Sequence, residues 1–296
     1  MKLSVIIVSW NVRDLLSKLL DSIFQFTEGI EYEVIVIDNN SNDGTCERIK
    51  NSYQNWLEKK QLKIVCNDYN AGFAKANNQG LKIAKGEYVL FMNPDMELIE
   101  NSFEKMIRLM EKDSAIGIAT CRLLYGDKTI QPNVKSLPSL CSQIFILLKI
   151  HHFFYWLPCL KKYLQKEFDY SEHAYIEQSM GAFIFTRKKV INKIGGWDEA
   201  YWLLWEDVEL CKQAKNLGYE IVYTPTTEII HYESKSFEQT AGLKKQKRFN
   251  RGMLTYFKKH HSKLSVITLY ILQPISYLLT ILTKALNIKQ RPQSRI

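Results

Sequence analysis

Apolar residues in the first 120 positions form short continuous runs, and segments with helical spacing lie between them. The apolar runs, which are rich in Val and Ile, predict strands at Leu3–Val8, Val34–Asp38, Leu62–Cys66, Tyr88–Met92 and Ile116–Thr120. Helical patterns occur at Leu15–Phe26, Thr45–Leu57, Ala71–Lys85 and Ile99–Glu111. Strands that are apolar on both faces and alternate with helices predict an α/β fold, in which helices flank a mostly parallel sheet.

Polar residues follow several of these predicted strands. Such sheets bind ligands at the carboxyl ends of their strands. The residues after the first, second and fourth strands include Ser9 and Asn11, Asp38 and Asn40, and Asn93 and Asp95. Neither the G-x-G-x-x-G of dinucleotide-binding oxidoreductases nor the G-x-x-x-x-G-K-[ST] of P-loop NTPases occurs, so both classes are disfavoured.

The composition changes at residues 137–164, where apolar and aromatic residues are mixed with Lys149, His151 and His152. This segment is either an ordinary pair of core helices or a partly exposed insert that touches lipid or a lipid-linked acceptor. The predicted strand Ala182–Thr186 and the predicted helix Glu206–Asn216 then return the chain to the core.

Charge is distributed unevenly along the chain, whose net charge is +9. Twelve of the 40 basic residues lie at positions 239–296, which contain none of the 31 acidic residues. The first 238 residues are therefore slightly acidic. A basic tail with apolar residues between its charges indicates an anionic membrane surface as partner and disfavours nucleic acid.

Within this tail, residues 264–283 carry no charge. The run is about long enough to span a bilayer. Pro274 near its middle instead predicts two short helices that lie in the membrane interface. The alternative is a helical hairpin packed on the body of the protein.

The six cysteines include no C-x-x-C pair, so a zinc site is disfavoured. Several lie in apolar runs, where Cys behaves as a small core residue. The apolar N-terminus lacks a cleavable signal pattern and is interpreted as a buried strand. We therefore expect a cytoplasmic protein with reduced thiols.

Several motifs together carry a resemblance to a known family. The first three are Asp38–Thr45, Asn70–Gly80 and Gly86–Asp95, and the later ones are Gly181-Ala182, Gly195–Asp198 and Trp205–Cys211. In order and spacing, residues 1–235 resemble the family 2 glycosyltransferases of the GT-A fold, and the later motifs resemble its rhamnosyltransferase-like branch.

The resemblance implies a Rossmann-like α/β fold, the GT-A fold of nucleotide-diphospho-sugar transferases. On this basis residues 1–238 form a catalytic domain. Its nucleotide-sugar-binding half spans residues 1–120, and its acceptor-binding half spans residues 121–238 with the insert at 137–164. Residues 239–296 form a membrane-associated helical appendage.

The donor site implied by the resemblance lies on the first half. Asp38 would accept the N–H of a uracil or thymine base, although it could simply cap the following turn. Asn77 stands where many relatives have Arg, so Lys75 would supply the positive charge. The full set of expected nucleotide-sugar contacts is Ser9, Asn11, Asp38, Asn40, Gly72, Lys75, Asn77, Asn93 and Asp95.

A divalent cation, Mg²⁺ or Mn²⁺, is expected because the departing diphosphate gains negative charge and such ions bind carboxylate oxygen. Asp95 is the expected ligand, and the resemblance implies His231 as a second one. The family usually has Asp-x-Asp where this chain has Asn93-Pro94-Asp95. Asn93 can hydrogen-bond a ribose hydroxyl but adds no charge, and Asn-Pro-Asp is also a good turn sequence.

Glu206 and Asp207 form a second acidic centre. An acceptor hydroxyl must lose a proton as it attacks, and Asp207 corresponds to the base of the family. Glu206 could instead be the base or orient the acceptor, and acids at a helix start are also favoured by the helix dipole. Sugars stack on aromatic rings. The expected acceptor contacts are Trp197, Asp198, Trp202 and Trp205, although one or two of the aromatic residues could equally belong to the core.

The resulting hypothesis is an inverting, metal-dependent glycosyltransferase at the cytoplasmic face of a membrane, attached peripherally or monotopically by its tail. The resemblance implies a dTDP- or UDP-sugar donor, with dTDP-rhamnose as the first choice, and a hydroxyl of a lipid-linked or cell-surface glycan as acceptor. Two alternatives are a UDP-hexose or N-acetylhexosamine transferase of the same family, and a catalytically silent, membrane-bound glycan-binding scaffold.

Overall fold

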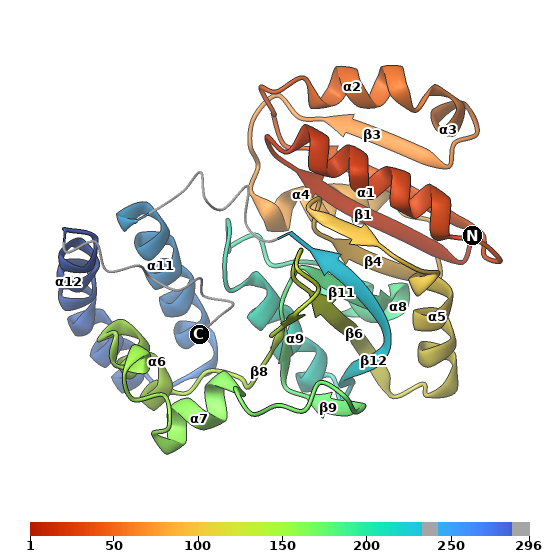
Figure 1. Cartoon of the computed structure of the whole chain (residues 1–296). Helices are drawn as coiled ribbons and strands as arrows, with labels where there is room; N and C mark the ends of the chain where they lie inside the picture. Colours follow the sequence, from red (N-terminus) through yellow and green to blue (C-terminus); the bar gives the residue numbers. More distant parts are fainter. Residues whose placement is uncertain (233–241, 286–296) are drawn as a thin grey trace.

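The computed structural model describes residues 1–232 and 242–285, which are built around one large sheet (Figure 1). The strand order is β3-β2-β1-β4-β11-β6-β12-β5; β7 pairs with β6, β9 pairs with β12, and β8 and β10 form a separate pair. The strands are β1 Leu3–Ser9, β2 Tyr32–Asp38, β3 Leu62–Cys66, β4 Tyr88–Met92, β5 Met96–Leu98, β6 Ile116–Leu124, β7 Ile130–Gln131, β8 Val134–Lys135, β9 Ala174–Ile176, β10 Gln178–Ser179, β11 Phe183–Arg187 and β12 Glu220–His231.

Helices cover both faces of the sheet, as the continuous apolar strands predict. In β1, Val5 and Ile7 pack into a core with α1, α2 and α5, whereas Ile6 and Val8 pack into a second core with α4, α8 and α9. The bounds of these helices are α1 Arg13–Phe26, α2 Thr45–Ser52, α4 Phe73–Ile83, α5 Ser102–Lys112, α8 Lys188–Ile194 and α9 Glu206–Asn216.

The directions of the strands bear out a mostly parallel sheet. β1 is parallel to both β2 and β4, β2 is parallel to β3, and β6 is parallel to β12. β11 is antiparallel to β4 and β6, and β5 is antiparallel to β12. Strand direction leaves no mark on an apolar run, so the sequence could not show these antiparallel strands.

One predicted helix is broken in the structure. The pattern at Thr45–Leu57 predicted one helix, but α2 ends at Ser52 and a short helix, α3, spans Gln54–Glu58. Tyr53 lies between them, and its hydroxyl donates to the Asp21 carboxylate at 2.8 Å. This anchoring to α1 favours the break.

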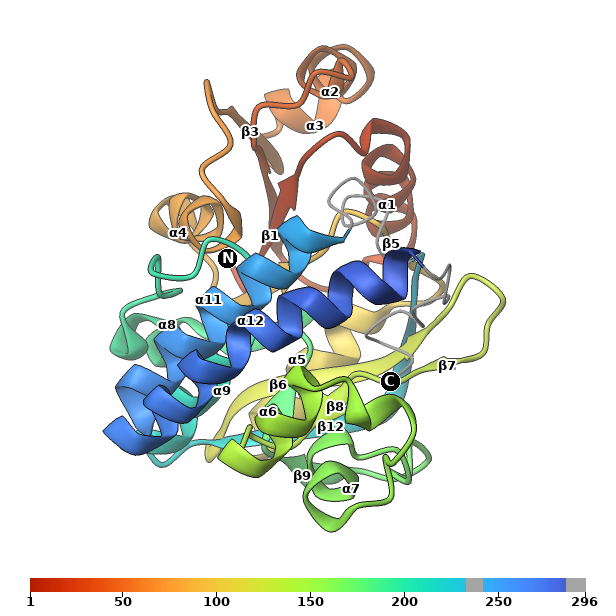
Figure 2. The ribbon, with the colours of Figure 1, turned by 90° about the vertical axis from the view of Figure 1, so that its left-hand side faces the viewer.

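The segment at 137–164 and the tail both pack on the body. The segment contains α6 Leu140–Leu147, the 3₁₀ turn η1 Ile150–His152 and α7 Pro158–Leu164. The tail contains α11 Leu243–His260 and α12 Lys263–Ala285, which lie side by side (Figure 2). A shared hydrophobic core joins the segment and the tail to residues around the start of α9. Its members include Leu147, Tyr201, Trp205, Val208, Met253, Tyr256, Phe257 and Leu269. Residues 239–241 and 286–296 of the expected appendage lie outside the described residues.

The expectation of two short helices around Pro274 is corrected, because α12 continues through the proline. A proline inside a helix costs about 3 kcal/mol. Packing on the neighbouring helices favours the unbroken form: Leu269 lies in the shared core, and the Thr280 hydroxyl donates to the side chain of Gln246 on α11.

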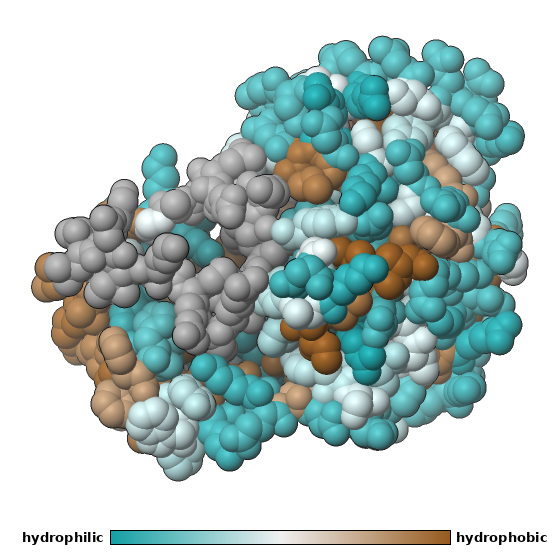
Figure 3. Space-filling view, in the orientation of Figure 1, coloured by the Kyte–Doolittle hydropathy of each residue, from teal (hydrophilic) through white to brown (hydrophobic). Residues whose placement is uncertain are grey.

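The other face of α12 is apolar and exposed. Residues spaced three or four apart lie on it, namely Leu264, Ile267, Ile271, Ile275, Leu278 and Ile281. Hydrophobic residues gather at the edge of the molecule where α12 lies (Figures 1 and 3). Within the described residues, one helical stretch, Lys263–Thr283, is long and apolar enough to cross a membrane.

Four of the six cysteines are paired, which corrects the expectation of reduced thiols. Cys46 at the start of α2 bonds to Cys66 at the end of β3, and Cys141 in α6 bonds to Cys159 in α7. The other two, Cys121 and Cys211, are buried core residues as expected. The pairs join separate elements, so their proximity depends on the fold.

Candidate active site

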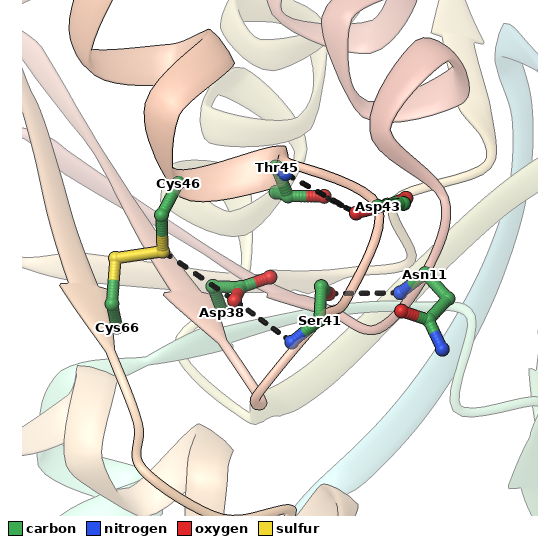
Figure 4. The surroundings of a disulfide bond; sticks show 7 residues. All are labelled: Asn11, Asp38, Ser41, Asp43, Thr45, Cys46 and Cys66. Carbon is green, nitrogen blue, oxygen red and sulfur yellow. Dashed lines mark hydrogen bonds between the residues drawn. A yellow bond between two sulfur atoms is a disulfide. The ribbon is translucent and has the colours of Figure 1, made fainter.

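Asp38 lies at the carboxyl end of β2, almost fully buried. One carboxylate oxygen, Oδ2, accepts a hydrogen bond from the Ser41 backbone N–H at 3.1 Å and lies 3.4 Å from the sulfur of Cys46 (Figure 4). The other oxygen, Oδ1, is buried and has no hydrogen-bond partner among the described residues. Burial raises the pKa of Asp38. An unmet acceptor at a strand end suits the N–H of a nucleotide base.

The turn beside Asp38 is closed by reciprocal contacts with the end of β1. The Asn11 backbone N–H donates to the Ser41 hydroxyl at 2.8 Å (Figure 4). The Asn11 side chain accepts from the Asn42 N–H at 2.8 Å. Asn11 and Asn40 both have positive φ, which Asn tolerates well. Asn40 is exposed, and the buried Ser9 hydroxyl has no partner among the described residues.

Asn39 organises the donor loops, a role that the sequence interpretation missed. Its side-chain oxygen accepts from the Ala71 N–H at 2.9 Å, and its amide nitrogen donates to Asn70 Oδ1 at 3.0 Å and to the Gly72 carbonyl at 3.3 Å. These bonds fix the loop after β3 against the loop after β2. The motif contains several neighbouring Asn residues, so nothing in the sequence marked Asn39.

Gly72 connects the donor loop to the acceptor side. Its φ is +83°, and a Cβ there would lie 2.7 Å from Trp202 side-chain and backbone atoms. The Phe73 N–H also donates to the Trp202 carbonyl at 2.9 Å. A residue with a side chain would therefore both strain the backbone and separate the two loops.

The predicted cation and amide on α4 lie in different settings. Lys75 is exposed, and its ammonium donates to the Tyr69 hydroxyl at 3.0 Å. Asn77 is buried, and its side chain donates to the Phe73 carbonyl one turn earlier. Asn77 thus has an evident structural role, whereas Lys75 remains accessible from solvent.

The structure brings Asn93, Asp95 and His231 together at the ends of β4 and β12. His231 Nε2 lies 3.3 Å from Asp95 Oδ1 and 3.4 Å from the Asn93 amide nitrogen. On the other side of the ring, Nδ1 lies 2.7 Å from Gln131 Oε1, which can only accept. Nδ1 therefore carries a proton, and Nε2 faces the Asp95 carboxylate.

This arrangement fits a divalent cation. A carboxylate oxygen and an imidazole nitrogen, the two ligand types expected for the cation, face each other across 3.3 Å. Mg²⁺ and Mn²⁺ accept such a partial protein set when substrate phosphates and water complete it. Gln131, which the sequence interpretation missed, sets the His231 tautomer from outside the set, as is usual for metal-binding histidines.

Glu206 and Asp207 begin α9. Asp207 accepts from the Gly181 N–H at 3.0 Å and from its neighbour Val208 N–H at 2.9 Å. Glu206 is buried, and its Oε2 has no partner among the described residues. Burial and the adjacent Asp207 raise the pKa of Glu206 strongly, and burial also raises the pKa of Asp207. We infer that Glu206 is the protonated member of the pair.

Backbone contacts hold Asp207 beside the Asn93-Pro94-Asp95 segment. The Asn93 N–H donates to the Ala182 carbonyl at 2.9 Å, and the preceding residue, Gly181, donates to Asp207. Antiparallel β11 creates this proximity, because its start lies beside the end of β4. Groups from the two halves of the chain therefore meet at one edge of the sheet.

Two members of the expected aromatic acceptor wall are buried. Trp197 is 2% exposed and packs edge-on against Phe73 and Phe91. Trp205 is buried in the shared core but also lines a cavity beside Asp207, and Asp198 forms an ion pair with Lys259 of α11. Trp202 is 40% exposed, and the Arg248 guanidinium lies 4.1 Å from its ring centre. Large apolar side chains near a motif fill the core as readily as they line a site.

Comparison with known proteins identifies the family. The glycosyl transferase family 2 model matches residues 4–194. The chain belongs to glycosyl transferase family 2. It is therefore a transferase, and the sequence-based identification of the family is confirmed.

Three curated relatives of this family 2 glycosyltransferase each align with 79% of the chain. The O-antigen biosynthesis protein RfbC of Myxococcus xanthus is 28% identical, and the alignment spans 18% of its length. The N-acetylglucosaminyl-diphospho-decaprenol L-rhamnosyltransferase of Mycobacterium tuberculosis is 24% identical, with 77% of its length covered. The rhamnosyltransferase WbbL of Escherichia coli is 25% identical, with 85% covered.

Solved structures confirm the GT-A fold of the family 2 glycosyltransferase. The mannosyltransferase PcManGT of Pyrobaculum calidifontis, in complex with GDP-Man and Mn²⁺, matches with a TM-score of 0.58 at 15% identity, over 99% of this chain and 77% of that one. Residues 1–349 of S. aureus TarS, in complex with UDP, match with a TM-score of 0.55 at 16% identity, over 100% and 77%.

Proposed function

We propose that this glycosyltransferase is an inverting, divalent-cation-dependent enzyme that transfers rhamnose from dTDP-rhamnose to a sugar hydroxyl of a lipid-linked acceptor. The observation that carries the proposal is the meeting of Asp95, His231 and Asp207 at one sheet edge. The names of the rhamnosyltransferase relatives support the choice of donor sugar.

The chain's own residues divide the work. Asp38 Oδ1 would accept the base N–H of the donor nucleotide, while Asn39 holds the surrounding loops. Asp95 and His231 would hold the cation, which when bound would offset the charge of the leaving diphosphate. Asp207 would accept the proton of the attacking acceptor hydroxyl. Direct attack from the face opposite the leaving group would invert the anomeric centre.

We further propose that α12 attaches the enzyme to the surface of a membrane. Its exposed apolar face supports a helix lying in the interface, because the opposite face already packs on α11 and α6. Lys244, Lys247, Arg251 and Lys258 of α11 are exposed and would favour anionic lipid. Attachment would bring the active site close to a lipid-linked acceptor.

A donor panel tests the enzymatic proposal. Full-length protein with MnCl₂ is expected to hydrolyse dTDP-rhamnose faster than UDP-glucose or UDP-N-acetylglucosamine, as measured by release of free sugar. Preference for a UDP-sugar would correct the donor while keeping the enzyme. No turnover of any nucleotide-sugar, with or without acceptor, would contradict the proposal and favour the glycan-binding scaffold.

A further inference from the structure

A cavity of about 130 Å³ lies next to Asp207, between the start of α9 and the segment that contains α6 and α7. Lys135 and Gln178 line it from the β8–β10 pair, and His151 and Tyr163 line it from the α6–α7 segment. Phe249 of α11 also contributes. The cavity therefore joins the proposed base to the two regions that carry the most exposed apolar residues.

Two polar groups in this cavity lack partners. Lys135 and Gln178 face each other as a register pair of β8 and β10. Among the described residues, the Lys135 ammonium has neither a hydrogen bond nor a carboxylate within 4.0 Å; its recorded contact is the Tyr163 ring at 5.9 Å. Gln178 is 6% exposed, and its Oε1 has no partner among the described residues. The unmet Gln178 acceptor is buried and therefore costly, and Lys135 is half-buried beside it, so a polar ligand would be favoured here.

The charged residues around the cavity indicate the sign of the charge on that ligand. His151 is neutral at physiological pH, because burial and nearby cations lower its pKa to about 3. Lys135 is thus the one cation among the residues lining this cavity. Burial lowers the pKa of Lys135, and the charge of Asp207 opposes that effect. An ammonium in this position is stabilised by a bound anion.

An exposed aromatic cluster lies close in the chain to one residue of the cavity lining. Directly after the lining residue His151 come Phe153, Phe154, Tyr155 and Trp156, all of which are exposed. Aromatic side chains of this kind favour the interface between water and lipid. An acceptor with a sugar, a phosphate and a lipid chain would match these groups in order: the sugar at Asp207, the phosphate at Lys135 and the lipid at the exposed aromatic residues.

We propose that this cavity is the acceptor subsite and that Lys135 binds a phosphate group of the acceptor, while Gln178 accepts a hydrogen bond from its sugar. The proposal rests on the proposed function and adds the residues that recognise the acceptor. Lys135 is a binding residue in this assignment, and Asp207 remains the base.

The test uses full-length protein and two soluble acceptors with the same sugar. One is an octyl phosphodiester of N-acetylglucosamine, and the other is neutral octyl N-acetylglucosaminide. Lys135→Met is expected to raise KM for the phosphodiester at least tenfold and to leave KM for the neutral glycoside and donor hydrolysis nearly unchanged. Lys135→Arg should restore most of the affinity. Lys162→Met, which removes an exposed lysine of α7, is the matched control and should behave as wild type.

Binding is also measured without turnover, by ³¹P line broadening of the phosphodiester, so the proposal is testable even if neither acceptor is used. Broadening by wild type that is lost in Lys135→Met supports it, and equal broadening by both overturns it. Lys135→Met could instead lower kcat equally for both acceptors and displace the acid limb of the pH profile. That result would show that Lys135 acts through Asp207, and it would also overturn the proposal. Absence of both donor hydrolysis and transfer in wild type would instead reject the proposed function.

Discussion

The two acidic centres of this enzyme differ in what surrounds them. Asp95 lies beside His231 Nε2, so a carboxylate oxygen and an imidazole nitrogen face each other. Asp207 lies beside a second carboxyl group, Glu206, and its oxygens already accept two backbone N–H groups. The first arrangement suits a cation, and the second suits a proton. In the proposed function, the same residue type would thus serve two kinds of chemistry because its neighbours differ.

The largest expected effect is at the cation centre. Asp95→Ala should lower transfer by about 10³-fold or more, because His231 would be the remaining ligand of the pair. EDTA should have the same effect on wild type, and Mn²⁺ binding followed by electron paramagnetic resonance should weaken in the variant. Glu97→Gln, which removes a carboxylate two residues away, is the control and should bind Mn²⁺ normally. Full transfer in EDTA would reject the cation role.

At the proton centre the expected effect is smaller. Asp207→Asn keeps the shape of the side chain but removes the proton acceptor, so transfer should fall by about 10²-fold with little change in donor binding. Glu206→Gln should cost much less, because Glu206 is already neutral. Steady-state kinetics on both variants check this. An inactive Glu206→Gln beside an active Asp207→Asn would reverse the two roles.

A third test compares the exposed face of α12 with the first 120 residues as surfaces that bind membrane. Replacing Ile267 and Ile271 by Ser removes apolar area from the exposed face of α12, so binding to anionic liposomes should weaken about tenfold. Donor hydrolysis in detergent should be unchanged. The control replaces Ile83 and Ile99, which are exposed on the donor half, by Ser. Equal loss of liposome binding in both double variants would show that α12 is not the attachment surface.

The pH dependence of transfer should reflect the raised pKa of Asp207. The base works only when ionised, so activity should fall as pH drops through that raised pKa, at a higher pH than for an ordinary aspartate. The titratable and charged groups around it are Glu206, Lys135, His151, Tyr163 and Cys211. Glu206→Gln should leave the acid limb nearly in place. A limb at the position of a free carboxylate would contradict the burial of Asp207.

The smallest effect concerns packing of the tail on the acceptor half. A Cβ at Gly252 of α11 would meet the Trp205 ring at 2.7 Å, so Gly252→Ala should lower the free energy of unfolding by about 1–3 kcal/mol. Transfer should fall a few-fold because Trp205 immediately precedes Glu206. Thr255→Ala on the same helix is the control for thermal melts. An unchanged melting temperature for Gly252→Ala would show that this contact is loose.

The sequence predicted the first part of the sheet better than the second, for a physical reason. β1, β2 and β4 contain continuous apolar runs, and their polar ends lie in motifs, so Asp38 and Asp95 could be placed at strand ends. Lys135 and Gln178 belong to two-residue strands and to no motif. The cavity that they line needs contacts between segments far apart in the chain, and such contacts leave no local pattern. The burial of Trp197 and Trp205 was hidden for the same reason.

Each of the two cystine bridges lies near a different part of the candidate site. Cys46–Cys66 links the start of α2, beside the Asp38 turn, to the end of β3, whereas Cys141–Cys159 links α6 and α7 next to the cavity. Each bridge is therefore a local reporter, since its thiols react with an alkylating reagent only after reduction and opening of that region. Two isotopically distinct reagents, applied before and after denaturation, would record which part loosens first, and the buried Cys121 and Cys211 would mark global unfolding.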